Sequence, residues 1–245
     1  MKLLSLNTWG GQLNRDFDEF IKKQAGSIDI FCFQEVFDKA HDTRPGLGPV
    51  HPDLYKELQV LLPSYIHYHA PSQDNDEGLA IFVKKALKVD KSGDIFVHRW
   101  FNAMVGDDGA TMGRNIQYIE FRHDGATYTV VNFHGLWNGL GKIDTPERFE
   151  QSKNVKKFLD SAKGYKILCG DFNLMPNTES IAIIEKGMRN LIKDYDIKTT
   201  RSRHYKTTGE KFADYIIVSP GLKVIDFQVL KDPISDHLPM LLEFE

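Results

Sequence analysis

Short apolar runs alternate with amphipathic helical segments along the whole chain, and this alternation limits the possible folds more than any other feature. The predicted strands of the first half cover residues 2–7, 28–34, 65–70, 79–84 and 95–98. The predicted helices of the same half cover residues 15–25 and 53–62. No repeat, low-complexity tract or linker interrupts the pattern. It therefore predicts an α/β fold.

The second half of the chain continues the same rhythm and adds clear turn and cap signals. Asp124-Gly125 predicts a hairpin between two apolar, β-branched runs. Thr145 followed by Pro146 predicts the start of a helix that ends at Lys163-Gly164, and Thr178 is a candidate N-cap for the next helix. The predicted strands of this half cover residues 115–122, 126–132, 165–169, 213–219, 222–230 and 239–244.

Composition restricts the class of protein. With 245 residues and 41% apolar content, the chain can bury one sizeable core, so we expect a single domain over residues 1–245. The formal net charge of -3 does not favour a polyanionic partner. Cys32 and Cys169 lie in apolar runs, which suits buried thiols. No signal or membrane segment is recognisable, and we expect a cytoplasmic monomer.

The most informative residues are polar side chains that fall at the ends of predicted strands. They are Asn7, Glu35, His134, Asp171, Asn173, Asp214, Asp236 and His237. A carboxylate beside a core is costly unless it binds a cation or accepts several hydrogen bonds. Taken singly, each of these residues has an ordinary structural explanation as a cap, a turn residue or a surface group. If the strand ends converge, the set provides oxygen ligands for a cation of the magnesium type and two imidazoles for proton handling.

Several other chemistries lack their motifs. The sequence has no Cys/His cluster at zinc spacing, no glycine-rich phosphate loop and no dinucleotide fingerprint. It also lacks the Gly-x-Ser-x-Gly nucleophile motif. Hydrolysis of a phosphate ester by a metal-assisted water is the reaction that remains.

Six motifs, in this order along the chain, resemble those of the endonuclease/exonuclease/phosphatase superfamily. They are Leu6-Asn7-Thr8-Trp9, Phe33-Gln34-Glu35-Val36, Asn132-Phe133-His134-Gly135, Gly170-Asp171-Phe172-Asn173, Ala213-Asp214-Tyr215 and Ser235-Asp236-His237-Leu238-Pro239. One tetrapeptide is weak evidence, whereas six in order are specific. The resemblance implies a four-layer α/β sandwich of two mixed β-sheets flanked by helices.

The resemblance also implies roles for the motif residues. Glu35 would be the main ligand of Mg or Mn, with Asn7 and Asp236 assisting. Asp171 would orient or deprotonate the attacking water, and Asn173 would position it. His237, oriented by Asp214, would contact the phosphate. His134 would act on the opposite side, as a general acid or an electrostatic clamp, and Glu77 is the candidate acid that pairs with it.

Other positions are candidates for substrate contacts. They are Arg114, Trp137, Arg201 and His204, of which the last two belong to a basic segment at residues 198–211. A basic segment is more often a solvated loop, and Trp137 is as well explained by packing as by stacking. Trp9 and His134 stand where abasic-site endonucleases carry other residues, which argues against a close relationship with those enzymes.

The sequence thus predicts a phosphodiesterase or nuclease that acts on a phosphate ester, possibly DNA or RNA. The alternatives are a phosphatase of small sugar or inositol phosphates, and a phosphodiesterase of lipid head groups. A noncatalytic binding module with the same fold is the least favoured, because every core motif position carries a suitable residue.

Overall fold

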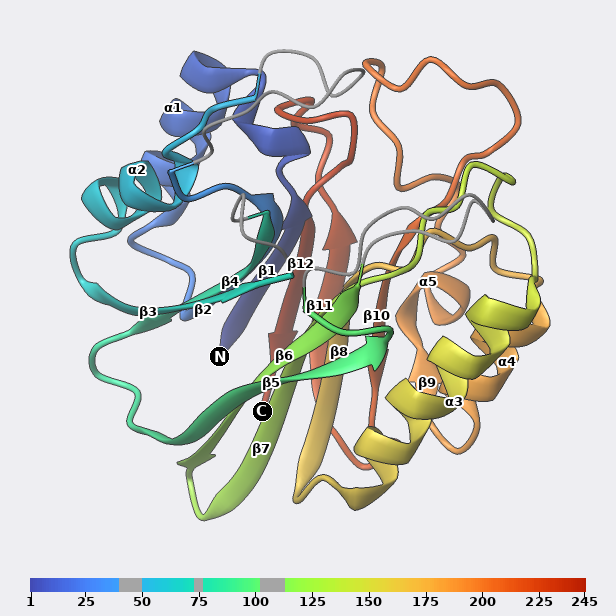
Figure 1. The fold of residues 1–245 in the computed structure, drawn as a ribbon. Coiled ribbons are helices and arrows are strands. Elements are labelled where there is room, and N and C mark those ends of the chain that lie inside the picture. The colour runs from blue at the N-terminus through green and yellow to red at the C-terminus, as the bar shows by residue number, and fades with distance from the viewer. Residues whose placement is uncertain (40–49, 73–76, 102–112) are drawn as a thin grey trace.

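Two β-sheets face each other in the computed structural model, which describes residues 1–39, 50–72, 77–101 and 113–245 (Figure 1). The first sheet consists, in spatial order, of β11 (Val224–Val229), β12 (Met240–Phe244), β1 (Lys2–Asn7), β2 (Ile30–Val36), β4 (Gly78–Lys84) and β3 (Tyr65–Pro71). The second consists of β5 (Val89–His98), β6 (Arg114–His123), β7 (Ala126–His134), β8 (Tyr165–Asp171), β10 (Asp214–Val218) and β9 (Arg189–Asn190).

Helices cover the outer faces of both sheets. The helices α1 (Asn14–Gln24) and α2 (Leu54–Leu61) lie on the first sheet, after a short 3-10 helix at Trp9–Gly11. The helices on the second sheet are α3 (Pro146–Ser161), α4 (Glu179–Glu185) and α5 (Leu191–Asp194). None of the described helices is long and apolar enough to cross a membrane.

Both sheets are mixed. β1 runs parallel to β2, and β7 runs parallel to β8, whereas the other neighbouring strands are antiparallel. The predicted four-layer sandwich of two mixed sheets is therefore confirmed. Because β1 runs parallel to β2 and β7 runs parallel to β8, the carboxyl ends of each pair lie at one edge of its sheet, and both edges are at the same end of the sandwich (Figure 1).

The alternation along the strands explains the layers. In β1, Leu4 and Leu6 pack with Phe17 of α1, whereas Leu3 belongs to the core between the sheets.

Polar side chains also join the sheets. Gln34 donates from Nε2 to Oδ1 of Asn132 at 2.7 Å, and Asn132 donates from Nδ2 to the carbonyl of Phe33 at 2.9 Å. The amide of Asn132 thus links β7 to the side chain and the backbone of β2.

Several predicted details are confirmed. Asp124 and Gly125 both have positive φ, 47° and 78°, and close the hairpin between β6 and β7. The hydroxyl of Thr145 accepts a hydrogen bond from the Arg148 N–H at 3.4 Å, as expected of an N-cap. Both cysteines are free and buried.

Other predictions need correction. β5 begins at Val89, not at residue 95, because its polar first half forms an exposed edge strand that lacks an apolar alternation. The short β9 and α5 were not predicted. Thr178 is the N-cap residue of α4, as predicted, but its side chain makes no cap hydrogen bond, because its hydroxyl donates to the Met175 carbonyl. Asp144 supplies the side-chain acceptors at this helix end, since its two carboxylate oxygens accept from the N–H groups of Glu179 and Ser180.

Candidate active site

Glu35 lies in a bulge at the end of β2. The pairing of β2 with β4 shifts between Phe33 and Val36, which places one extra residue on β2. Glu35 itself has φ of 55°, an uncommon conformation for a residue with a side chain. Burial, and then the charge of Glu77, raise the pKa of Glu35 to about 7. A nearby cation would relieve this cost.

Asn7 connects Glu35 to the second sheet. Its Nδ2 donates to Glu35 Oε1 at 2.9 Å and to Asp171 Oδ2 at 3.0 Å. Its Oδ1 accepts from the backbone N–H of Trp9 at 2.9 Å. Asn7 thus presents its amide nitrogen to both carboxylates and holds them close together across the two sheets.

Asp171 is placed by the glycine that precedes it. Gly170 has φ of 136°, and a Cβ there would lie 2.0 Å from the carbonyl oxygen of Phe133, so only glycine fits. This close approach keeps β8 paired with β7 up to the partners His134 and Asp171. The second carboxylate oxygen, Oδ1, accepts from the backbone N–H of Asn173 at 2.8 Å.

The environment of Asp171 fixes its charge. Burial alone would raise the pKa of this carboxyl, but the positive charges of His237, His134 and Arg201 hold the pKa well below its ordinary value. Asp171 is therefore an anion at neutral pH. Its oxygens can accept hydrogen bonds from a water molecule or a substrate hydroxyl.

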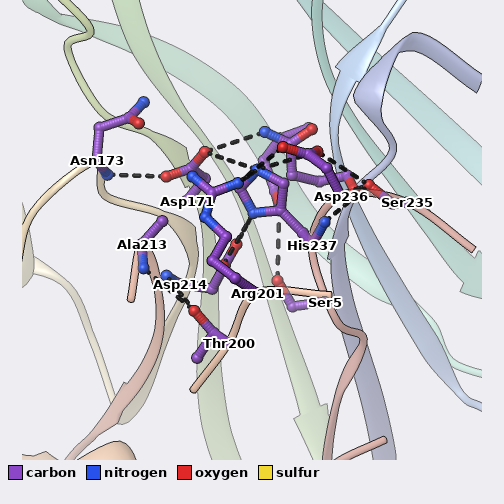
Figure 2. Close-up of polar contacts among 12 residues, drawn as sticks. Ser5, Asp171, Asn173, Thr200, Arg201, Ala213, Asp214, Ser235, Asp236 and His237 are labelled. Atoms are coloured by element: carbon purple, nitrogen blue, oxygen red, sulfur yellow. Dashed lines mark hydrogen bonds and ion pairs between the residues drawn. The ribbon is translucent and has the colours of Figure 1, made fainter. Parts of the chain in front are cut away.

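His237 is oriented by Asp214 (Figure 2). Its Nδ1 lies 2.8 Å and 2.9 Å from the two carboxylate oxygens of Asp214, so Nδ1–H donates to that carboxylate. Nε2 lies 3.5 Å from Asp171 Oδ2 and also contacts Nη1 of Arg201. Burial and Arg201 lower the pKa of His237, but the carboxylates around it prevail and raise it.

His134 is the second histidine near Asp171. Its Nε2 is 3.8 Å from Glu35 Oε1 and 3.9 Å from Asp171 Oδ2. Burial, and then the charge of Arg114, lower the pKa of His134 to about 4. Its imidazole is therefore neutral at pH 7 and can donate or accept one hydrogen bond at each nitrogen.

These side chains surround a pocket with a volume of about 320 Å³. Fourteen described residues line it: Trp9, Glu35, Glu77, Arg114, His134, Trp137, Lys142, Asp171, Asn173, Arg201, Tyr205, Thr207, Asp236 and His237. Acidic, basic and aromatic side chains thus meet in one small space. A site of this kind suits a polar, anionic ligand.

The structure brings most of the residues predicted from the sequence to this pocket. Three of them, Asn7, Asp214 and His204, do not line it. Asn7 and Asp214 lie directly behind it, in contact with Asp171 and His237 respectively. His204 belongs to the basic segment, where its backbone N–H donates to Ser202 Oγ at 3.1 Å.

Two of the predicted substrate contacts already have carboxylate partners. Arg114 Nη1 lies 3.4 Å from Glu77 Oε1, in an ion pair that is almost completely buried. Arg201 Nη1 donates to Asp236 Oδ2 at 3.0 Å. Glu77 therefore pairs directly with Arg114, and it affects His134 through its charge, which raises the pKa of that histidine.

Lys142, Tyr205 and Thr207 were not predicted from the sequence as pocket residues. Trp9 was noted only because abasic-site endonucleases carry a different residue at its position. Lys142 lies in the connection between β7 and α3, and it is 1% exposed. Tyr205 belongs to the basic segment, whose charges drew attention to its arginines. No local pattern marks either residue, because both reach the pocket through loops.

The donor set fits a divalent cation. Ligand atoms of Glu35, His134 and Asp171 lie within 4.8 Å of one another, and so do those of Asp171, Asp214 and His237. In the second group both oxygens of Asp214 already accept from His237, so Glu35, which belongs to the first group alone, is the better candidate for holding the cation. Carboxylate oxygens favour Mg²⁺ and Mn²⁺ over softer metals.

Comparison with known families agrees with this geometry. The model of the Endonuclease/Exonuclease/phosphatase family matches residues 4–237. Among curated proteins, an UPF0294 protein of Yersinia pseudotuberculosis is 30% identical over 125 residues. That match covers 50% of this chain and 45% of the relative, so the chain matches less than half of the relative's length.

Solved structures share the fold over the full chain. A mannosyl-6-phosphatase of Bacteroides thetaiotaomicron superposes with a TM-score of 0.78 at 21% identity, covering 100% of this chain and 99% of that one. TDP2 of D. rerio, complexed with a single-strand DNA product, superposes with a TM-score of 0.73 at 16% identity, covering 100% and 98%. At these identities the likeness shows the fold alone.

Proposed function

Because this chain belongs to the endonuclease/exonuclease/phosphatase family, we propose that it hydrolyses a phosphate ester with a divalent cation, Mg²⁺ or Mn²⁺, held at Glu35. The observation that supports this most strongly is the meeting of Glu35, Asp171 and His237 at one pocket, with Asp214 orienting His237 from behind. Asp236 and Asn7 are further candidates for holding the cation or its waters. When bound, the cation would supply positive charge to the phosphate oxygens.

The remaining steps belong to the side chains. Asp171, an anion fixed by Asn7 and Asn173, accepts a hydrogen bond from the attacking water and directs its lone pair at phosphorus. His237, held by Asp214, donates from Nε2 to a phosphate oxygen as charge develops there. His134 is neutral in the free protein, so it donates a hydrogen bond to the leaving oxygen.

The substrate within this class has two candidates. A phosphodiester such as the end of a DNA or RNA strand agrees with the motif set and with the solved likeness to TDP2 bound to a DNA product. The pocket volume of about 320 Å³ favours a small ester, such as a sugar phosphate, over a continuous duplex. The likeness to a mannosyl-6-phosphatase supports this second candidate.

The first prediction tests the reaction class. Asp171→Asn removes the negative charge that orients the water, and His237→Ala removes the phosphate donor. Each change is expected to lower the Mg²⁺- or Mn²⁺-dependent hydrolysis rate by about 10²- to 10⁴-fold. The assay is a screen of bis-nitrophenyl phosphate, DNA, RNA and sugar phosphates with each cation, with chelator as the blank.

The screen also has outcomes that contradict the proposal. Rates near wild type in either variant, with an unchanged circular dichroism spectrum, would remove these residues from the mechanism. Binding of phosphate esters without cation-dependent turnover of any of them would identify a noncatalytic binding module.

A further inference from the structure

Lys142 is a buried cation in the wall of the pocket. The residue is 1% exposed, and its Nζ donates to the backbone carbonyl of Phe212 at 3.2 Å. Within the described part of the chain, no carboxylate forms an ion pair with this ammonium. Arg114 and Arg201 differ from it, since each is paired with an acid of the same pocket, Glu77 and Asp236.

An ammonium in this position is costly to the folded protein. Burial, and then the neighbouring charge of Arg201, lower the pKa of Lys142 to about 8. A carbonyl oxygen replaces only part of the lost hydration, because an ammonium has three donors. The cost is understandable if a ligand anion completes the environment of Nζ.

The surroundings hold Nζ in one place. The ring of Tyr205 contacts two cations, with Nζ of Lys142 4.8 Å and Cζ of Arg201 4.1 Å from its centroid. Tyr205 donates from its hydroxyl to Glu210 Oε2 at 2.7 Å, and Glu210 Oε1 accepts from the backbone N–H of Lys142 at 3.2 Å. Glu210 thus ties the segment of Tyr205 to the loop of Lys142.

We propose that Lys142 is a catalytic residue that binds a phosphate oxygen of the substrate, and that Tyr205 is the positioning residue that fixes it. The inference rests on the proposed function, because it assigns a further contact in the same pocket. Asp171, Asn173 and Lys142 line that pocket together, so Lys142 borders the space where the phosphate would bind. Its charge would act on both the bound ester and the transition state.

The test uses the full chain and inorganic phosphate as the probe. Lys142→Met removes the charge while keeping most of the apolar stem, and it is expected to weaken phosphate binding by about 10- to 100-fold in calorimetry. Lys142→Arg keeps the charge and should recover part of the affinity. The matched control is Lys206→Met, which removes an exposed lysine next to Tyr205 and should leave the affinity unchanged.

The stability of Lys142→Met distinguishes a role in ligand binding from a merely structural role. If the ammonium is kept for ligand binding, Lys142→Met should unfold at the same or a higher urea concentration than wild type, because an unpaired buried charge has been removed. Lower stability together with unchanged phosphate affinity would overturn the proposal.

A double-mutant cycle tests the role of Tyr205. Tyr205→Phe deletes the bond to Glu210 and keeps the ring, so it should weaken phosphate binding by a smaller factor than Lys142→Met. Combined with Lys142→Met it should add nothing, since both changes act through the same ammonium. Additive losses would show that Tyr205 does not act through Lys142.

Hydrolysis separates this inference from the proposed function. If wild type turns over no phosphate ester with Mg²⁺ or Mn²⁺, the proposed function fails, whatever the phosphate affinities are. If wild type is active and Lys142→Met matches it in KM, kcat and phosphate affinity, only the role of Lys142 fails.

Discussion

Glu35 is a residue whose position in the site destabilises the fold. Its backbone adopts positive φ in a bulge, and its carboxylate lies where burial and Glu77 raise its pKa to about 7. Both features oppose folding when no cation is present. Strain and desolvation of this kind are typical of functional sites, where a ligand compensates for them.

The second prediction concerns how the ionisation of Glu35 changes the stability of the cation-free protein with pH. The folded carboxyl has the higher pKa, so between about pH 4.5 and 7 the folded state binds more protons than the unfolded state. Its contribution to stability is therefore complete below this window and is lost as pH rises through it. Glu35→Gln, which cannot ionise, should become more stable than wild type as pH increases from 5 to 8.

Urea unfolding in chelator at several pH values measures this difference. Glu19→Gln, an exposed change on α1, is the control and should differ from wild type by the same amount throughout. A stability difference between Glu35→Gln and wild type that does not vary with pH would contradict the shifted pKa.

Among the elements of the fold, the loop between β7 and α3 is held by hydrogen bonds to one buried side chain, that of Arg148. Arg148 of α3 is 1% exposed and donates to three backbone carbonyls of this loop. Its Nη1 lies 2.6 Å from the carbonyl oxygens of both Gly141 and Ile143, and its Nε and Nη2 both donate to Leu136. The guanidinium thus shapes the loop that carries Trp137 and Lys142.

The third prediction concerns this loop. Arg148→Met leaves three backbone carbonyls without their donor, of which that of Leu136 is buried, so the free energy of unfolding should fall by about 2–4 kcal/mol. Arg122→Met, at a side chain that is 79% exposed, should change it by less than about 0.5 kcal/mol. Denaturant unfolding of both variants measures the difference. Equal losses would mean that the buried hydrogen bonds of Arg148 do not stabilise the loop.

At the scale of the whole molecule, the site lies across the two sheets. Asn7 and Glu35 come from the first sheet, His134 and Asp171 end strands of the second, and the connection between β11 and β12 supplies Asp236 and His237 (Figures 1 and 2). A cation bound at Glu35 would therefore act against separation of the sheets. Its binding energy would appear as stability of the entire fold.

The fourth prediction measures that coupling. Mn²⁺ at about 100 times its dissociation constant should stabilise the wild type by about 2.7 kcal/mol, and Glu35→Gln should lose most of this gain. Thermal unfolding with Mn²⁺ and with chelator gives the shift, and Glu19→Gln should keep it. An equal Mn²⁺ shift in Glu35→Gln would place the cation elsewhere.

The sequence alone determined the α/β layers and the identity of the residues at the strand ends. Alternation of apolar residues sets which face of a strand is buried, and local turn signals such as Asp124-Gly125 place its ends. Both depend on neighbours in sequence. The six ordered motifs could therefore be read without coordinates, although the polar edge strand β5 was partly missed for want of such a pattern.

How those residues meet depends on contacts between distant parts of the folded chain. The bulge at Glu35, the pairing of Arg114 with Glu77 and the burial of Lys142 arise between segments far apart along the chain. The polarity of a lysine in a loop predicts exposure, and packing against Tyr205 and Phe212 reverses that expectation. Charge and residue type are local properties, whereas desolvation depends on everything that surrounds a side chain, and desolvation is what gives this pocket its chemistry.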